Sequence, residues 1–290
     1  MATTVIGAFS ELHGRQGLTT NQRSTATTRV GSLKTFFLNN FTMRESVFPI
    51  GSYKRETICS GERDIDLMAC LEPYGTTDYW GSYKNDSKAC LYWVRDRLNN
   101  RYYATKVSSR KVCVKLDFTD IVTDVTACFP RQGGGYLMPD GSGGWMATNP
   151  PFHATFMTDA NKDHDSKLKP LVRLIKAWNI ANSHHLSSFH VELMVERIHR
   201  GTTIRSHPEE VAYTLRNLPA QVRSSFTDPW TGGGRVDSYL SADTRAMVAR
   251  MLEDDADRAE KAEEHRLAGK MTLAFERWDV VYRNTFPSYG

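Results

Sequence analysis

Apolar residues recur every three or four positions in two long segments, which is the spacing of an amphipathic helix. In the segment 20–41 these positions are Val30, Leu33, Phe37 and Phe41. In the segment 168–181 they are Leu171, Leu174, Ile175 and Trp178. Similar patterns predict helices over 83–98, 189–198, 208–220 and 241–268, and a closing apolar helix over 278–286. The second half of the chain is therefore expected to be helical.

Runs rich in β-branched and aromatic residues predict strands in the first half of the chain. Two such runs, 111–118 and 121–129, are joined by a short turn, so we expect them to lie side by side in a small sheet. The segment 48–71 is expected to supply one strand, a sharp turn and a second strand. Together with the helices over 20–41 and 83–98, this order predicts a mixed α/β lobe.

The sharp turn contains a Gly-Ser pair, Gly51 and Ser52, directly after the apolar run Phe48-Pro49-Ile50. Glycine lets the main chain approach an anion closely, and the N–H groups and hydroxyl of such a turn can hold a phosphate. We therefore interpret this turn as a phosphate-binding site.

Asp64 and Asp66 alternate with Ile65 and Leu67. In a strand this alternation puts both carboxylates on one face and both apolar side chains on the other. Two carboxylates on one face repel each other unless a cation lies between them, and carboxylates are ligands of Mg²⁺. A solvated Asp-x-Asp pair on an edge strand is the alternative. The phosphate turn upstream and the interleaved apolar residues favour the metal site.

A site for two metal ions usually takes a third carboxylate from a neighbouring strand. Three aspartates compete for this role, namely Asp117, Asp120 and Asp124. We prefer Asp124 because the segment 122–127 has the composition of a strand interior, whereas Asp120 lies in the predicted turn.

Composition and charge are those of a cytoplasmic globular protein. The 290 residues, 40% of them hydrophobic, suffice for one large domain or two tightly joined lobes. A net charge of +4 suits a protein that handles nucleoside triphosphates, but it is too small to require a long nucleic-acid partner. The five cysteines form no Cys-x-x-Cys pair, so we expect reduced thiols in the core. Neither a signal peptide nor a membrane-spanning run is expected.

The order Gly51-Ser52, Asp64-x-Asp66 and a later strand aspartate resembles nucleotidyltransferases with a palm of the DNA polymerase β type. Further segments resemble the CD-NTases, the bacterial relatives of cyclic GMP-AMP synthase. These segments are 136–140, 144–150, 171–179, 186–192 and 278–287. The resemblance covers nearly the whole chain, from Phe9 to Pro287.

The resemblance implies an α/β (α+β) fold with a polymerase β-like nucleotidyltransferase palm built on a mixed sheet. It also implies an N-terminal spine helix and a C-terminal helical lobe. We expect the catalytic core and its N-terminal helix to occupy residues 1–160 and the helical lobe to occupy residues 161–290. The two parts are expected to pack as one rigid unit.

The resemblance further implies synthesis of a cyclic di- or trinucleotide from nucleoside triphosphates, ATP among them, with release of pyrophosphate. Asp64, Asp66 and Asp124 would hold two Mg²⁺ ions, for which Mn²⁺ can substitute. Family members act in bacterial anti-phage defence (CBASS), where a separate effector protein responds to the product. The alternatives are transfer to RNA ends or to a small molecule, and a catalytically idle fold that senses nucleotides or nucleic acid. No membrane contact and no stable nucleic-acid partner are expected.

The resemblance also assigns three residues of the helical half to the nucleotide. Lys176 would grip the triphosphate, although a single lysine on a helix is commonly solvated. Ser188 would also touch the triphosphate, and a serine at this place is in addition a helix N-cap. Phe189 would stack on a base, with packing in the core as the alternative.

The segment 145–150 lies near the bases of the substrates in the family, and we expect it to be a pocket wall in a glycine-rich loop. Within it, Thr148 and Asn149 can make polar contacts through their side chains, so we predict that they carry more of the base preference than Met146. The animal synthase has an arginine where this chain has Met146, so its base choice cannot be transferred.

Overall fold

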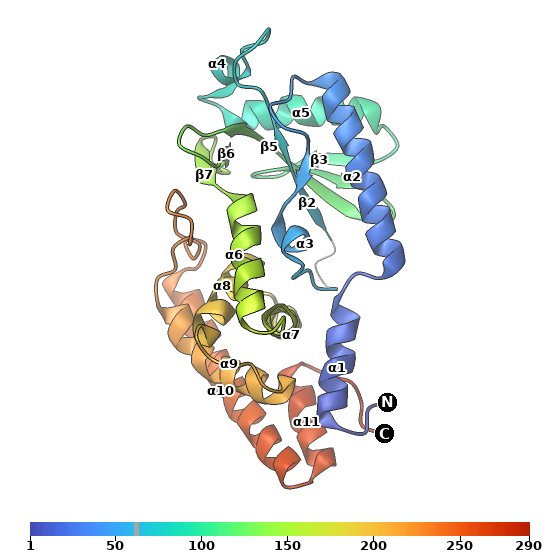
Figure 1. Cartoon of the computed structure of the whole chain (residues 1–290), viewed down its shortest axis with the longest axis vertical. Coiled ribbons are helices and arrows are strands. Elements are labelled where there is room, and N and C mark those ends of the chain that lie inside the picture. Colours follow the sequence, from blue (N-terminus) through green and yellow to red (C-terminus); the bar gives the residue numbers. More distant parts are fainter. Residues whose placement is uncertain (61–63) are drawn as a thin grey trace.

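A mixed sheet forms the lobe at the top of Figure 1, and a set of helices forms the lobe beneath it. This computed structural model describes residues 1–60 and 64–290. The strands are β1 (Phe48–Pro49), β2 (Ile65–Cys70), β3 (Lys106–Ser109), β4 (Val114–Asp117), β5 (Val122–Pro130), β6 (Tyr136–Pro139) and β7 (Trp145–Thr148). Their order is β1-β2-β5-β4-β3, with β6 beside β5 and β7 beside β6.

The middle of the sheet is the parallel pair β2 and β5, which is flanked by the antiparallel strands β1 and β4. Ile65 and Leu67 of β2 are fully buried, whereas Asp66 between them is half-buried. The alternation predicted for this strand is therefore confirmed. The predicted runs 111–118 and 121–129 contain β4 and β5, which pair side by side as expected.

Helix α2 (Thr20–Asn40) lies along the sheet lobe and confirms the helix predicted over 20–41. A capping box starts it: the Thr19 hydroxyl accepts a hydrogen bond from the Gln22 N–H, and the Gln22 side chain accepts one from the Thr19 N–H. Leu33 and Phe37 are fully buried in the core of the sheet lobe. This helix therefore backs the sheet as the predicted spine.

The helix predicted over 83–98 corresponds to α5 (Ser87–Arg101), and a separate short helix, α4 (Tyr79–Tyr83), ends where the predicted helix begins. The carboxylate of Asp86 accepts a hydrogen bond from the Ala89 N–H at 3.0 Å and so caps the start of α5. The predicted start was wrong because the backbone of the N-cap residue Asp86 is not helical, whereas the spacing of apolar residues gives no sign of a break there.

The segment 145–150, which we expected in a glycine-rich loop, instead begins with strand β7, the second strand of a β-hairpin over 136–148. Strands β6 and β7 pair along their whole length. Gly141 and Gly143 in their connection both have positive φ, which glycine adopts without strain. The Trp145 indole N–H donates a hydrogen bond to the Tyr83 carbonyl, and the ring packs against the core of the sheet lobe. The tryptophan is thus a core residue, while the rest of its strand faces a cleft.

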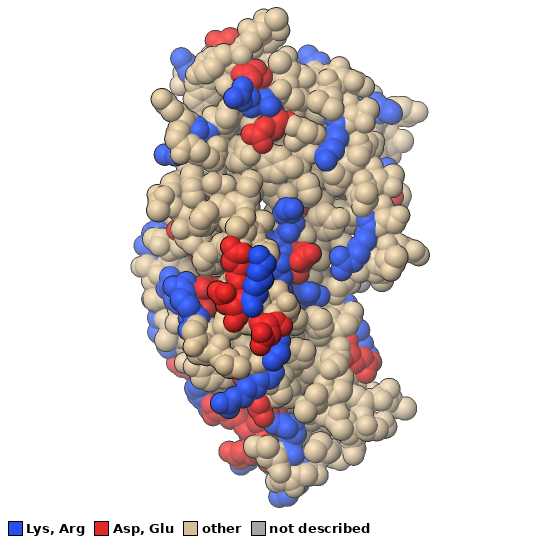
Figure 2. Space-filling view, viewed as in Figure 1, with Lys and Arg blue, Asp and Glu red and all other residues tan. Residues whose placement is uncertain are grey.

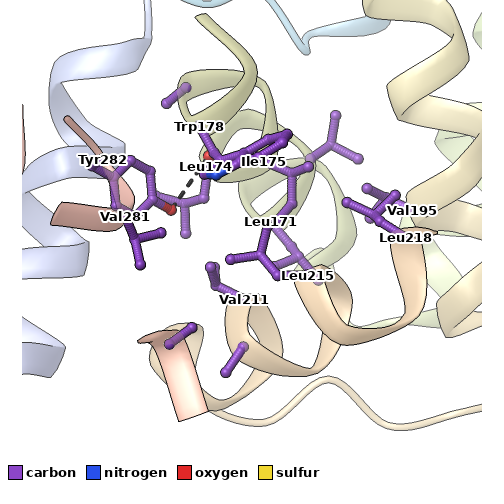
Figure 3. Close-up of a cluster of buried hydrophobic side chains, with 14 of the residues drawn as sticks. Leu171, Leu174, Ile175, Trp178, Val195, Val211, Leu215, Leu218, Val281 and Tyr282 are labelled. Carbon is purple, nitrogen blue, oxygen red and sulfur yellow. Dashed lines mark hydrogen bonds between the residues drawn. The ribbon is translucent and has the colours of Figure 1, made fainter. Parts of the chain in front are cut away.

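The helical lobe contains α6 (Pro150–Asp163), α7 (Leu168–Ala181), α8 (Ser188–His199), α9 (His207–Arg223), α10 (Ala242–Leu267) and α11 (Met271–Val281). Figure 3 shows Leu171, Leu174 and Trp178 of α7 in one apolar cluster with Val211 and Leu215 of α9. The helix predicted over 168–181 is therefore confirmed, and its apolar face is the centre of this core. Within the described ranges, no helix combines the length and apolarity that a membrane crossing requires.

The N-terminal helix α1 (Val5–Gln16) belongs to the core of the helical lobe rather than to the sheet lobe. The ring of Phe9 meets the ring of Trp278 edge-on at 4.8 Å between centroids. Ala2 and Tyr289 form a β-bridge, so the two ends of the chain lie together (Figure 1). The division at residue 160 stays a prediction, and α1 ties the first segment of the chain to the second lobe.

The closing helix predicted over 278–286 has different bounds, because α11 begins at Met271 and ends at Val281. Arg283 and Asn284 take the left-handed conformation, which stops the helix. Phe286 lies beyond the helix, but its ring still packs 5.0 Å from Phe9.

All five cysteines are buried and carry free thiols, as the sequence predicts. Cys70 and Cys128 are register partners on the parallel strands β2 and β5. Burial raises the pKa of the Cys90 thiol to about 12, so this group stays protonated at neutral pH.

Candidate active site

Three aspartates converge where β2 and β5 run side by side. Asp66 and Asp124 are register partners on these strands, and Asp64 precedes Asp66 by two residues on the same face. One carboxylate oxygen from each of the three lies within 4.8 Å of the others. The competing aspartates are outside this cluster and form ion pairs: Asp117 with Lys115 at 3.3 Å, and Asp120, which also lines the neighbouring cleft, with Arg29 at 2.7 Å.

The electrostatics of this cluster favour a bound cation. Burial, followed by the nearby negative charge of Asp64, raises the pKa of the Asp124 carboxyl, while a hydrogen bond from the Cys113 thiol lowers it. Asp124 Oδ1 is buried and has no hydrogen-bond partner among the described residues. Carboxylate oxygens at this spacing suit Mg²⁺ or Mn²⁺, so the residues present fit the metal site that the sequence predicts.

The Gly51-Ser52 turn is packed directly against this cluster. Gly51 has a φ of 62°, and a Cβ atom at this position would overlap Asp66 Oδ2. The glycine is therefore required by the neighbouring carboxylate as well as by the turn. Ser52 follows it as a buried residue in the short helix α3 (Gly51–Arg55), which begins at this turn.

A cleft of about 1050 Å³ opens beside the carboxylates, between the two lobes. Its lining comes from both lobes and includes Ser52, Asp64, Asp66, Lys115, Met146, Thr148, His153, Ser188, Phe189, Asp228 and Arg235. A cleft of this size can enclose a nucleotide-sized ligand. Basic and acidic side chains intermix on the face that Figure 2 shows, without a broad patch of one sign.

The structure brings Ser188 and Phe189 to the wall of this cleft. The N-cap of α8 is Ser187, whose hydroxyl accepts a hydrogen bond from the His190 N–H, so the expectation that Ser188 is the cap is corrected. Ser188 is instead the first helical residue. The centroid of the Phe189 ring lies 4.7 Å from that of the His153 ring and 4.9 Å from the Arg55 guanidinium carbon.

Of the residues predicted to choose the base, Thr148 and Met146 line the cleft. Thr148 ends β7 with 8% of its surface exposed, and Met146 is 43% exposed. The Asn149 side-chain oxygen accepts a hydrogen bond from the Phe152 N–H at 3.1 Å and caps α6. A contact from Asn149 to a base would compete with this cap.

Lys176 lies within the protein, with 1% of its surface exposed. Its Nζ donates a hydrogen bond to the Thr57 carbonyl at 3.0 Å and lies 3.8 Å from Glu192 Oε1. A direct contact with the triphosphate therefore stays a prediction. The alternative of a solvated lysine does not agree with this burial.

Sequence reasoning missed a hydrogen bond in the cleft wall. His153 Nε2 lies 2.8 Å from Asp228 Oδ1 and joins α6 to the loop after α9. The same loop places Trp230 against Gly135, where a Cβ atom would come within 2.7 Å of the ring. The signal in the sequence was Asp228-Pro229-Trp230 ahead of three glycines, in the segment between the helices predicted over 208–220 and 241–268.

Comparison of the chain with known proteins agrees with the geometry of this site. The family model described as Second Messenger Oligonucleotide or Dinucleotide Synthetase domain matches residues 4–161, more than half of the chain. A cyclic AMP-AMP-AMP synthase of Acinetobacter is 28% identical over 261 residues, which are 83% of this chain and 72% of the relative.

Solved structures of CdnC from E. coli MS115-1 share the fold. CdnC in its complex with HORMA-deltaN superposes with a TM-score of 0.78 at 16% identity, over 98% of this chain and 97% of CdnC. CdnC with ATP superposes with a TM-score of 0.77 at 16% identity, over 97% of this chain and 98% of CdnC. The chain therefore belongs to the family of second messenger oligonucleotide or dinucleotide synthetases, the bacterial CD-NTases, with their polymerase β-like palm.

Proposed function

We propose that this protein is a nucleotidyltransferase that joins nucleoside triphosphates into a cyclic di- or trinucleotide and releases pyrophosphate. The observation that carries the proposal is the convergence of Asp64, Asp66 and Asp124 within 4.8 Å beside a cleft of about 1050 Å³. An idle sensor would have no need for three carboxylates gathered in this way, since their mutual repulsion is unfavourable without a cation.

In this proposal Asp64, Asp66 and Asp124 would hold two Mg²⁺ or Mn²⁺ ions that act on an attacking hydroxyl. When bound, the ions would lower the pKa of that 3′- or 2′-hydroxyl and neutralise charge on the α-phosphate and the departing pyrophosphate. The buried Oδ1 of Asp124 has the open coordination capacity that this role requires.

The residues around the carboxylates would hold the nucleotide. Gly51 and Ser52 bind the β and γ phosphates, and Ser188 adds a hydroxyl from the opposite lobe, because both serines line the same cleft. Phe189 offers an aromatic face to a base from the start of α8. Positioning supplies most of the catalysis in phosphoryl transfer, so these contacts would set the rate as much as the affinity.

The names of the relatives support the cyclic product and ATP as one substrate. The Acinetobacter relative is a cyclic AMP-AMP-AMP synthase, and CdnC has been solved with ATP. We also propose that the product acts in the bacterial cytoplasm as an anti-phage signal that a separate effector protein detects. Transfer to RNA ends is a weaker proposal, since the face in Figure 2 carries no broad basic patch.

Incubation with each triphosphate and either Mg²⁺ or Mn²⁺, followed by phosphatase treatment and mass spectrometry, tests the proposal. A cyclic product has no terminal phosphate, so it should survive the phosphatase. A transferase for RNA or a small molecule would yield product only after its acceptor is added. An idle sensor would bind nucleotide and leave every triphosphate intact.

A further inference from the structure

A buried ion pair joins the helix of the phosphate turn, α3, to helix α8 of the opposite cleft wall. Arg55, the last residue of α3, donates to both oxygens of Glu192 on α8, at 2.6 Å from Nε and 3.2 Å from Nη2. The Arg55 side chain is 8% exposed, and the Glu192 side chain is fully buried. The two residues are 137 positions apart in the chain, so this contact spans the two lobes.

The positions of Arg55 and Glu192 on their helices relate this ion pair to the two serines of the cleft. Arg55 follows Ser52 by three residues on α3, and Glu192 follows Ser188 by four residues on α8. Residues three or four apart share one face of a helix. The ion pair therefore links the two helix faces that carry the two cleft serines.

Further contacts hold the Glu192 carboxylate in place. The Thr57 hydroxyl donates to Glu192 Oε1 at 2.7 Å, and Lys176 Nζ lies 3.8 Å from the same oxygen. Burial by itself raises the pKa of Glu192, but the charges of Arg55 and Lys176, together with the hydrogen bonds from Arg55 and Thr57, lower it further than burial raises it, so the pKa lies below its ordinary value. Buried networks in which each member is satisfied hold one geometry rigidly.

We propose that Glu192 is a positioning residue that sets the distance between Ser52 and Ser188 across the cleft and thereby the grip on the β and γ phosphates. Lys176 supports this position of Glu192, since its Nζ donates to the Thr57 carbonyl and lies 3.8 Å from Glu192 Oε1. This inference rests on the proposed function, because it assumes that the two serines bind the triphosphate. Glu192 itself lies behind the wall and touches no substrate.

The test compares affinities for ATP and AMP, which differ only in the β and γ phosphates. Both are measured by displacement of a fluorescent ATP analogue at constant Mg²⁺, for the wild type and for Glu192→Gln. If Glu192 positions the two serines, the ratio of ATP affinity to AMP affinity should fall about tenfold in Glu192→Gln. Simple electrostatics predicts the opposite, since removing a carboxylate near an anion should strengthen ATP binding.

Glu56→Gln is the matched control. Glu56 follows Arg55 directly, but it is paired with Lys169 at 2.8 Å and its side chain is 71% exposed. Glu56→Gln removes one negative charge, as Glu192→Gln does, but it leaves the buried pair of Arg55 and Glu192 intact. Its ratio of ATP affinity to AMP affinity should therefore equal that of the wild type. Thr57→Val removes a single hydrogen bond to Glu192 and should lower the ratio about threefold.

An unchanged or increased ratio in Glu192→Gln overturns the inference while leaving the proposed function intact. Should Glu192→Gln fail the folding check by circular dichroism and gel filtration, Thr57→Val decides, and an unchanged ratio there overturns the inference. A wild type that binds ATP no better than AMP would instead refute both the proposed function and this inference.

Discussion

Asp66 of β2 stands directly opposite Asp124 of β5 in the register of two parallel strands. A slip of one residue in this pairing would turn one of the two carboxylates to the other face of the sheet. The same register places the apolar Leu67 beside Val125, and both are fully buried. The packing of the core and the assembly of the acidic cluster therefore depend on one and the same register.

Replacing the metal pair with neutral isosteres should separate catalysis from stability. The double variant Asp64→Asn, Asp66→Asn should form no detectable product, because the carboxylate ligands are lost. Its melting temperature, measured in chelator, should equal or exceed that of the wild type, because like-charge repulsion has been removed. Continued synthesis by this variant would show that the metal site lies elsewhere.

The choice of Asp124 as the third carboxylate is tested against Asp120. Asp124→Ala should lower the rate of product formation by several orders of magnitude, since a metal ligand is removed. Asp120→Ala should leave the rate almost unchanged and cost at most about 1 kcal/mol of stability, because its pair with Arg29 is at the surface. Steady-state rates and urea unfolding of both variants check this, and exchanged outcomes would contradict it.

Stability should fall in mild acid because of His190, which is buried on α8 beside the cleft wall. Burial lowers the pKa of His190 from 6.5 to about 4. Below pH 6.5 the imidazole of His190 therefore binds a proton in the unfolded chain but not in the folded protein. The contribution of His190 to the free energy of unfolding is complete above pH 6.5 and is lost as the pH falls toward 4.

Melting temperatures across this range should decline for the wild type and decline less steeply for His190→Gln, which does not titrate. His13 and His199, whose pKa values are also lowered to about 4 by burial, should keep part of the decline. Parallel curves for the wild type and His190→Gln would contradict the prediction.

The two serines at the start of α8 should have different roles. Ser187→Ala removes the N-cap and should cost about 1 kcal/mol of stability, with little effect on nucleotide affinity. Ser188→Ala should weaken ATP binding about tenfold through the lost phosphate contact. Denaturant unfolding and ATP titration of the two variants check this, and a reversed pattern would return the phosphate contact to Ser187.

The sequence predicted the parts of this protein whose cause is local. The helix α7 follows from the regular spacing of Leu171, Leu174 and Trp178, and the acidic cluster follows from alternation in two short strands. Strand β7 was taken for part of a loop because the glycines of its hairpin lie in the connection, where they mark a turn but do not reveal the paired strands on either side.

What the sequence could not show are contacts between distant residues. His153 and Asp228 are 75 positions apart, and Arg55 and Glu192 are 137 apart, so no local spacing distinguishes these paired side chains from solvated ones. Lys176 illustrates the same limit, because its helix was predicted correctly but its burial depends on Thr57 and Glu192 from other segments.

Base preference should depend on Thr148 more than on Asn149 or Met146. The Thr148 side chain lines the cleft, whereas the Asn149 oxygen caps α6. A site that hydrogen-bonds a group on the base discriminates against a base lacking it, so Thr148→Val, which keeps the shape and loses the hydroxyl, should change the ratio of ATP to GTP incorporation about tenfold. Asn149→Ala should mainly cost about 1 kcal/mol of stability. Radiolabelled triphosphates tested pairwise on both variants and on Met146→Ala decide the matter, and a preference that changes only in Met146→Ala would show that pocket shape selects the base.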